Sequence, residues 1–214
     1  MKRLGMAAMI FSLLLLAACS GSDIRDDLDR VLNDTFDAEE EYRAVQADLE
    51  EREKAEQQLF EEAMALTQEQ QDQVAEQAQE ALDSADERLE FLQTEKESMQ
   101  SAEDKFADID GVIESAEEDS VKTDLEALKA EMLERFTAHD RFAEAYEELI
   151  VHQKELYEML MDSESTLQML QEKAAEVNGQ NEQVQLAVTE FNELTQQVNE
   201  LKDETMEKLN ESAE

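Results

Sequence analysis

Apolar residues recur along most of the chain at alternating spacings of four and three, the pattern of helices that each bury one seam. The first such run extends from about Asp23 to Leu66 and predicts one long helix with a heptad seam. Arg52 and Glu56 weaken the middle of this seam, because both occupy positions that should be apolar. The seam positions are Ile24, Leu28, Val31, Thr35, Ala38, Tyr42, Val45, Leu49, Arg52, Glu56, Leu59, Ala63 and Leu66.

Two sequence signals divide the next part of the chain into a helix and a break. Thr67 and Gln70 have the spacing of a capping box, so a second helix is expected to begin there and to continue to about Phe106. The segment 108–111, Asp-Ile-Asp-Gly, is then the clearest break, because glycine is poor inside a helix and aspartate favours caps. The residues from this break to Ser120 fit either a short helix or a loop.

Two more long helices follow. The third is predicted from about Val121 to Met161, after which Ser165 and Gln168 make a second capping box for the fourth. Short connections between long helices place neighbours antiparallel. The sequence therefore predicts an all-α fold, an elongated antiparallel bundle or coiled-coil-like hairpins of about four long helices, in a single domain over residues 24–214. The seam of the fourth helix is Leu167, Leu170, Ala174, Val177, Val184, Val188, Phe191, Leu194, Val198 and Leu201.

Composition supports this fold class. The chain has no proline and only four glycines, so a sheet-based domain of this size would lack turn residues. Alanine, leucine, glutamate and glutamine dominate, and these are among the best helix formers.

The first 18 residues have the layout of a secretory signal peptide. Lys2 and Arg3 give a basic start, residues 6–16 are apolar, and two alanines precede the single cysteine of the chain, Cys19. The apolar run is too short for a permanent transmembrane helix, which needs about 20 residues. We therefore expect residues 1–18 to be removed.

The segment Leu16-Ala17-Ala18-Cys19 resembles the bacterial lipobox, whose pattern is L-[AS]-[GA]-C. In that family the cysteine is thioether-linked to diacylglycerol and becomes the new N-terminus. The resemblance implies that Cys19 carries a lipid anchor, that residues 19–23 form a tether, and that the rest of the chain lies outside the cytoplasm. The alternative is an ordinary signal peptide followed by a cysteine without a special role. An intrachain disulfide is excluded, because there is no second cysteine.

The charge of the chain excludes nucleic acid as a partner. Residues 1–18 carry two positive charges and no negative one, so their removal changes the formal net charge from −39 to about −41. Such a surface is repelled by nucleic acid, by anionic lipid headgroups and by anionic wall polymers.

The segment 106–117 partly matches a calcium-binding EF-hand loop. Asp108, Asp110 and Glu117 occupy positions 3, 5 and 12 of such a loop when it is aligned on Gly111. Position 1, which supplies the first carboxylate ligand, is Phe106. The alternative, an acidic loop at a helix break, is favoured, and no metal or other cofactor beyond the lipid is expected.

No set of residues has the pattern of an active site. His139 lies in the apolar stripe of the third helix and is expected to be a core histidine with a satisfied hydrogen bond, and His152 has no pattern around it that suggests catalysis. The two histidines are 13 residues apart, too far to bind one metal ion from one helical face. There is also no nucleophile elbow and no glycine-rich phosphate loop. The sequence therefore predicts a protein that is not an enzyme.

Three short segments resemble the YkyA-type cell-wall-binding lipoproteins of Gram-positive bacteria. They are Glu155-Leu156-Tyr157-Glu158-Met159-Leu160, Thr166-Leu167 with Leu170, and Phe191-Asn192-Glu193-Leu194-Thr195. The resemblance implies a membrane-anchored lipoprotein that contacts cell-wall material, and it brings no catalytic residues. The alternative is a protein–protein scaffold or a chaperone-like protein of the envelope. The sequence predicts no oligomeric state.

Replacing Cys19 by Ala tests the anchor. The variant should lose the lipid, so that unprocessed precursor or released protein accumulates, whereas the wild-type protein partitions into a detergent phase. Detergent-phase partitioning followed by immunoblotting measures the difference. A Cys19→Ala variant that stays membrane-bound at the normal processed size would contradict the lipobox interpretation.

Overall fold

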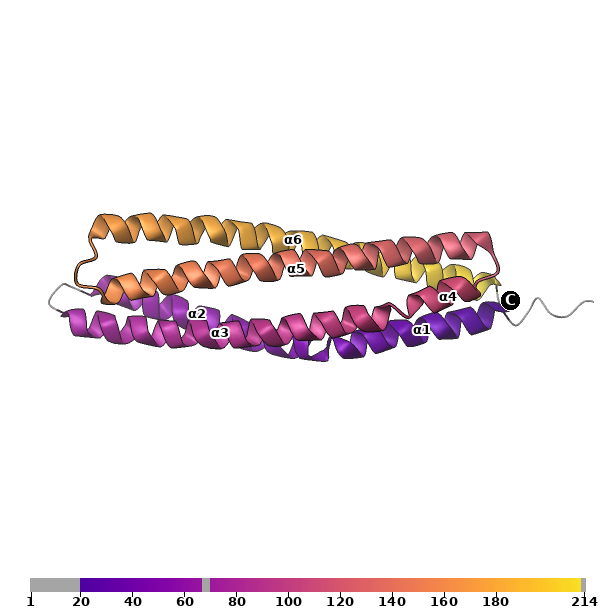
Figure 1. Cartoon of the computed structure of the whole chain (residues 1–214), viewed down its shortest axis with the longest axis horizontal. Helices are drawn as coiled ribbons and strands as arrows, with labels where there is room; N and C mark the ends of the chain where they lie inside the picture. Colours follow the sequence, from indigo (N-terminus) through magenta and orange to yellow (C-terminus); the bar gives the residue numbers. More distant parts are fainter. Residues whose placement is uncertain (1–19, 67–69, 213–214) are drawn as a thin grey trace, which may run out of the picture.

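The computed structural model describes residues 20–66 and 70–212 as a long rod of helices (Figure 1). The helices are α1 (Ser20–Ala38), α2 (Glu40–Ala65), α3 (Gln71–Phe106), α4 (Ile109–Ser115), α5 (Asp119–Met161) and α6 (Leu167–Ser212). α1 with α2 makes the first rod-length helix, α3 with α4 the second, and α5 and α6 the third and fourth. These four run up and down in alternation (Figure 1). The all-α prediction of an elongated antiparallel bundle with about four long helices is confirmed.

The two ends of the rod differ in the helices that begin and end there. α1 begins and α6 finishes at the same end, which we call the proximal end (Figure 1). α2 ends and α3 begins at the opposite, distal end, where the α5–α6 connection also lies. α6 has 46 residues, so at about 1.5 Å per residue the rod is roughly 70 Å long.

The prediction of one unbroken helix from Asp23 to Leu66 was wrong, because the helix is interrupted at Glu39. The hydroxyl of Ser98, from α3, donates a 2.7 Å hydrogen bond to the carbonyl of Ala38. The same oxygen accepts a 3.0 Å hydrogen bond from the N–H of Tyr42. In a regular helix that N–H would bond the Ala38 carbonyl directly, and a side chain inserted between the two bends the helix.

The second long helix is interrupted at the predicted break, with a turn that begins one residue earlier than expected. α3 ends at Phe106, a turn at residues 107–108 follows, and Gly111 lies inside the short helix α4. Of the two possibilities for the residues after the break, the short helix is the one that forms. The turn keeps Phe106, Ile109 and Val112 all buried in the same core, which explains why the chain breaks before the glycine.

The α6 cap differs from the prediction by one residue. The Thr166 hydroxyl, not that of Ser165, accepts a hydrogen bond from the N–H of Met169 at 3.3 Å. The predicted capping residue of the second helix, Thr67, lies outside the described residues, and α3 begins at Gln71.

The proximal half of the rod is a closed bundle. One apolar cluster joins residues from α1, α3, α4, α5 and α6, and many of its side chains have almost no exposed surface. Its fully enclosed members include Leu28, Phe106, Ile109, Leu125 and Leu128. Here α1 packs against α6, so each of the four rod-length helices has two neighbours.

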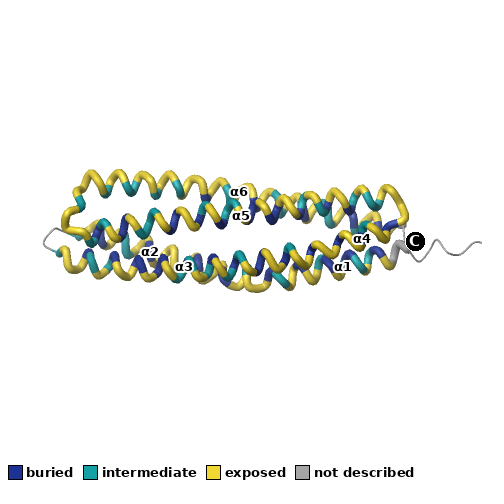
Figure 2. The backbone as a smooth tube through the Cα atoms, in the orientation of Figure 1, coloured by how far each residue is buried: buried dark blue, intermediate teal, exposed yellow. Residues whose placement is uncertain are grey.

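The distal half is open between the first and fourth helices. Beyond the bend at Glu39, α2 packs on α3 and makes at most marginal contact with α6, which packs on α5. The first half of α6 is mostly exposed or half-buried in consequence (Figure 2). The predicted seam of this helix is therefore only partly buried: Val184 and Phe191 are enclosed, whereas Leu167 and Val188 are exposed.

Candidate functional site

A groove runs between α2 and α6 along the distal half of the rod. Its volume is about 1000 Å³, and α5 forms its floor. The α2 wall consists of Arg43, Gln46, Ala47, Leu49, Glu50, Glu53, Glu56, Gln57 and Phe60. The α6 wall consists of Ala174, Val177, Asn178, Asn181, Val184, Gln185 and Val188. The floor consists of Arg88 from α3 and Phe142, Tyr146, Leu149, Gln153, Leu156 and Tyr157 from α5.

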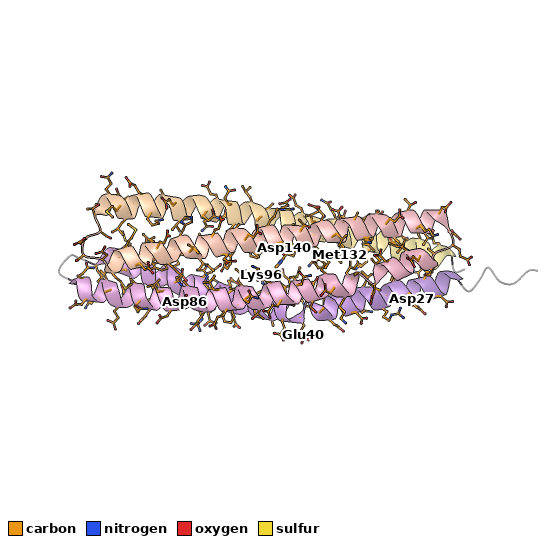
Figure 3. The ribbon with its side chains drawn as sticks, viewed as in Figure 1. Asp27, Glu40, Asp86, Lys96, Met132 and Asp140 are labelled. Carbon is orange, nitrogen blue, oxygen red and sulfur yellow. The ribbon has the colours of Figure 1, made fainter. Side chains whose placement is uncertain are left out.

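The groove has a mostly apolar and aromatic floor, and amide side chains line its walls. Leucine, phenylalanine and tyrosine side chains form most of the floor, and leucine, phenylalanine, valine and alanine form part of the walls, while asparagine and glutamine occupy much of the rest. The lining carries three carboxylates and two guanidinium groups. It is therefore nearly neutral, although the chain as a whole has a formal charge of −39. Charged side chains, Glu40 and Asp86 among them, project from the rod elsewhere (Figure 3).

A buried charged cluster lies under the groove. Arg88 is 1% exposed, and its Nη1 donates to both oxygens of Glu56 at 2.9 Å and to Oε1 of Gln153 at 3.1 Å. Its Nε donates to the hydroxyl of Tyr146 at 3.0 Å. The hydroxyl of Tyr157 donates to Glu56 at 2.7 Å. The cluster links α2, α3 and α5, and its charges are compensated within it.

One corner of this cluster is less completely bonded. Nη2 of Arg88 has its nearest carboxylate at 3.8 Å, the Oε1 of Glu53, which is too far for a hydrogen bond. That same oxygen accepts a 2.6 Å hydrogen bond from Tyr146. The side chain of Glu53 is about half exposed, so it forms the open edge of the cluster toward the groove.

Burial and neighbouring charges shift the pKa of both tyrosines and of Arg88. Burial raises the pKa of Tyr157, and the Glu56 carboxylate raises it further. Burial likewise raises the pKa of Tyr146, which outweighs the lowering effect of Arg88. Burial alone would lower the pKa of Arg88, but Glu56 and Tyr146 more than offset this, and its pKa is raised. Both phenols are therefore neutral and the guanidinium is charged at neutral pH.

A second polar layer lies at the bend. Both carboxylate oxygens of Glu39 accept hydrogen bonds from Arg135, at 2.7 and 3.2 Å, and Nε of Arg135 donates to Thr195 at 3.0 Å. This layer ties the bend to α5 and α6. It also borders a smaller cavity of about 580 Å³ between α1 and α6, at whose edge Phe36 is exposed.

The third polar layer contains His139. Its Nε2 lies 2.8 Å from Oε1 of Glu95, and the other oxygen of Glu95 accepts a 2.9 Å hydrogen bond from Gln46. Tyr42 and Phe191 pack edge-on against the imidazole ring. The prediction of a core histidine is confirmed, but its hydrogen bonding is satisfied at one nitrogen only, because Nδ1 is buried without a partner. Burial, with a smaller contribution from Glu95, raises the pKa of Tyr42 to about 12.

The residues singled out in the sequence do not meet at the groove. Cys19 and the preceding Leu16, Ala17 and Ala18 lie outside the described residues. Among the described residues, no three acidic, histidine or cysteine side chains are gathered closely enough to hold a metal ion. The calcium candidates Asp108, Asp110 and Glu117 accordingly do not form a cluster, and Asp110 instead pairs with Lys129 at 2.5 Å.

Two further observations concern His152 and the hydropathy of the described helices. His152 lies at the surface, with Nδ1 3.6 Å from Glu155 and 3.9 Å from Glu176. Within residues 20–66 and 70–212, no helix is both long and apolar enough to cross a membrane.

Sequence reasoning missed the residues on which the groove depends. Glu56 was read only as a flaw in the first seam, although it is the partner of Arg88. Arg88 and Glu95 were not assigned to the seam of the second helix, although they fall at heptad spacing with Ala85, Leu92 and Met99. Each of the three charged residues is at most 1% exposed. The available signal was the pairing of a charged seam residue with an opposite charge at a seam position of the neighbouring helix.

Comparisons with known proteins relate this chain to envelope lipoproteins. Residues 24–208 match the model of the YkyA family, described as "Putative cell-wall binding lipoprotein". A curated relative from Bacillus subtilis (strain 168), named "Uncharacterized lipoprotein YkyA", is 27% identical over 191 residues, which cover 89% of this chain and 86% of the relative.

A solved structure has the same fold. It is a 1.6 Å crystal structure of a conserved protein of unknown function from Staphylococcus aureus. The TM-score is 0.77, and the match covers 90% of this chain and 96% of the other. The sequences are only 17% identical, so the likeness concerns the fold alone.

Removing the Arg88 side chain should destabilise the bundle strongly. Arg88→Leu leaves Glu56 buried without its partner, which costs about 3–5 kcal/mol of the free energy of unfolding. Arg141→Leu is the matched control, because Arg141 pairs with Glu134 and Glu190 at the surface and exposed pairs contribute little. Urea unfolding followed by circular dichroism measures both. Equal effects of the two substitutions would show that the buried cluster has no special role.

The three tyrosines of the chain predict an alkaline transition. All three have raised pKa values in the folded state, so above about pH 10 the unfolded chain releases protons that the folded chain retains. The contribution of the tyrosines to the free energy of unfolding should therefore be constant below about pH 10 and fall as the pH rises beyond it. Tyrosinate absorbance and helical circular dichroism should change together. A free tyrosine derivative serves as the reference for an unperturbed phenol. Titration of all three phenols near pH 10 while the helices remain intact would contradict the prediction.

Proposed function

Because this chain belongs to the YkyA family of lipoproteins, we propose that it is a non-enzymatic protein of the cell envelope, anchored by a lipid on Cys19, that binds a component of the cell wall in the groove between α2 and α6. The family description supports a binding role, and the lipobox pattern supports an anchor outside the cytoplasm. One observation carries the proposal: the groove is open and amphipathic, and no catalytic constellation lines it.

The position of the groove along the rod suits such a role. A lipid on Cys19 would hold the proximal end at the membrane, because α1 begins at the next residue. The α2 wall extends from Arg43 to Phe60, which are 23 and 40 residues beyond Ser20. At about 1.5 Å per helical residue, the groove would lie roughly 35–60 Å along the rod from the anchor, away from the anchored end.

The charge of the chain restricts which wall component can bind unaided. Anionic wall polymers would be repelled by a formal charge of −39, and divalent cations would have to bridge them to the surface carboxylates. The nearly neutral lining makes the groove the part of the rod where this repulsion is weakest. Binding in the groove should therefore not require calcium, whereas attachment through the outer faces should.

Retention on the cell wall tests the proposal. The lipid-anchored protein in detergent is mixed with sedimented cell walls, with and without millimolar calcium, and the bound fraction is measured. Val188→Glu puts a longer, charged side chain into the groove from a position that is 36% exposed, and it should reduce retention about tenfold without calcium. Leu186→Glu is the matched control, because Leu186 is on the same helix, is 64% exposed and does not line the groove.

The two variants also separate the groove from the rest of the surface. Both add the same charge to the same helix, so a difference between them cannot arise from net charge. Circular dichroism verifies that both remain folded. Absence of retention of the wild-type protein with and without calcium would refute wall binding, and equal loss in both variants would refute a role for the groove.

A further inference from the structure

The two walls of the groove face each other with the spacing of coiled-coil seams. On α6, Val177, Asn181, Val184 and Val188 follow one another at intervals of four, three and four residues, and all line the groove. This is the a/d spacing by which one helix packs into another. Of the three valines only Val184 is buried, so the seam is largely without a partner.

The α2 wall has the same spacing. Gln46, Leu49, Glu53 and Phe60 fall at intervals of three, four and seven residues and also line the groove. A four-helix bundle would close these two faces on each other, as α1 and α6 do in the proximal half. Beyond the bend at Glu39 the two faces stay apart. Leu49 and Val184 are buried in a cluster with α3 and α5, whereas Glu53, Asn181 and Val188 are exposed along the gap.

The dimensions of the gap fit one further helix. The α2 wall spans residues 43–60 and the α6 wall residues 174–188, so the walls are about 25 and 21 Å long. A helix of roughly 14–17 residues has this length. Its apolar face would rest on Leu149 and Leu156 of the floor, and its polar flanks would reach the amides of Asn178 and Gln185.

The charge of the walls determines the kind of helix. α2 carries nine carboxylates against three cationic residues, and the first half of α6, residues 167–190, carries four against one. Both helices are thus net acidic beside the neutral lining. A second copy of this chain, with a formal charge of −39, would be repelled. A segment with lysine or arginine beside its apolar stripe would be attracted.

We propose that the component of the cell wall that binds in the groove is a wall-associated protein, and that the groove is a docking site for an amphipathic, cationic helical segment of that protein, which inserts as a fifth helix between α2 and α6. The proposal rests on the proposed function in taking the groove as the binding surface, and it specifies the chemistry of the occupant. Recognition is of the helix-in-groove kind, in which apolar residues at helical spacing give affinity and the charged flanks give orientation and specificity.

A designed peptide tests the docking site directly. The probe is an 18-residue labelled helix with leucine at the a and d positions and lysine elsewhere, and the control peptide has glutamate in place of lysine. Binding to the lipid-anchored protein in detergent is measured by fluorescence anisotropy at low and at roughly molar salt. The lysine peptide should bind the wild-type protein and Leu186→Glu within twofold of each other. Val188→Glu should weaken binding at least tenfold, although its added negative charge favours a cationic peptide.

A photo-crosslinking side chain gives the location independently of affinity. Placed at Asn181, inside the groove, it should label the lysine peptide, and placed at Leu186 it should not. Binding that weakens with salt supports the charge argument.

Four results would overturn the proposal: no binding, equal binding to Val188→Glu and Leu186→Glu, equal binding of the glutamate peptide, or crosslinking from both positions alike. Sedimentation that shows a wild-type dimer lost in Val188→Glu would overturn it in favour of a second copy. These outcomes can be told apart from a failure of wall retention. For this purpose, retention is measured on untreated walls and on walls boiled in detergent, which removes their proteins. Retention on both kinds of wall with no peptide binding would leave wall binding intact and exclude the helical occupant.

Discussion

The architecture depends on one serine hydroxyl placed within the hydrogen-bond ladder of a neighbouring helix. Ser98 of α3 separates the carbonyl of Ala38 from the N–H of Tyr42 and bonds to both. The polar groups released by the interruption thus keep partners, which makes the bend tolerable in a partly buried position. Before the bend the first helix packs on both α3 and α6. After it the helix packs mainly on α3, with side chains that also reach α5, and leaves the groove open.

The buried charges act on the register of the bundle more than on its net stability. Glu39 with Arg135, Glu95 with His139 and Glu56 with Arg88 form three layers along the rod, and each layer joins different helices. A well-packed apolar replacement of a buried pair is often as stable as the pair itself. If one helix slipped by a heptad, however, charged groups would be buried without partners. The layers therefore disfavour the shifted registers that a purely apolar heptad seam would permit. We infer that the apolar core contains these three polar layers because they fix the register of the helices.

The sequence was sufficient to predict the helices and their antiparallel arrangement, because heptad spacing and the absence of proline are local properties. It was not sufficient for the bend, since residues 38–40 include neither glycine nor proline and the cause is Ser98, some sixty positions away. The groove was missed for the same reason. Val177, Val184 and Val188 have the pattern of a buried seam, and whether a neighbour covers that seam depends on the direction in which α2 leaves the bend.

The even number of rod-length helices has a practical consequence for topology. α6 returns to the end at which α1 starts, so Ser20 and Ser212 lie at the same end of the rod, while the groove lies toward the other (Figure 1). A fluorescent protein or epitope fused after Ser212 would thus sit at the proximal end, leaving the groove unobstructed. Such a fusion would report on the base of the molecule. A reporter of what reaches its far end would instead have to be inserted in the connection between α5 and α6, at residues 162–166.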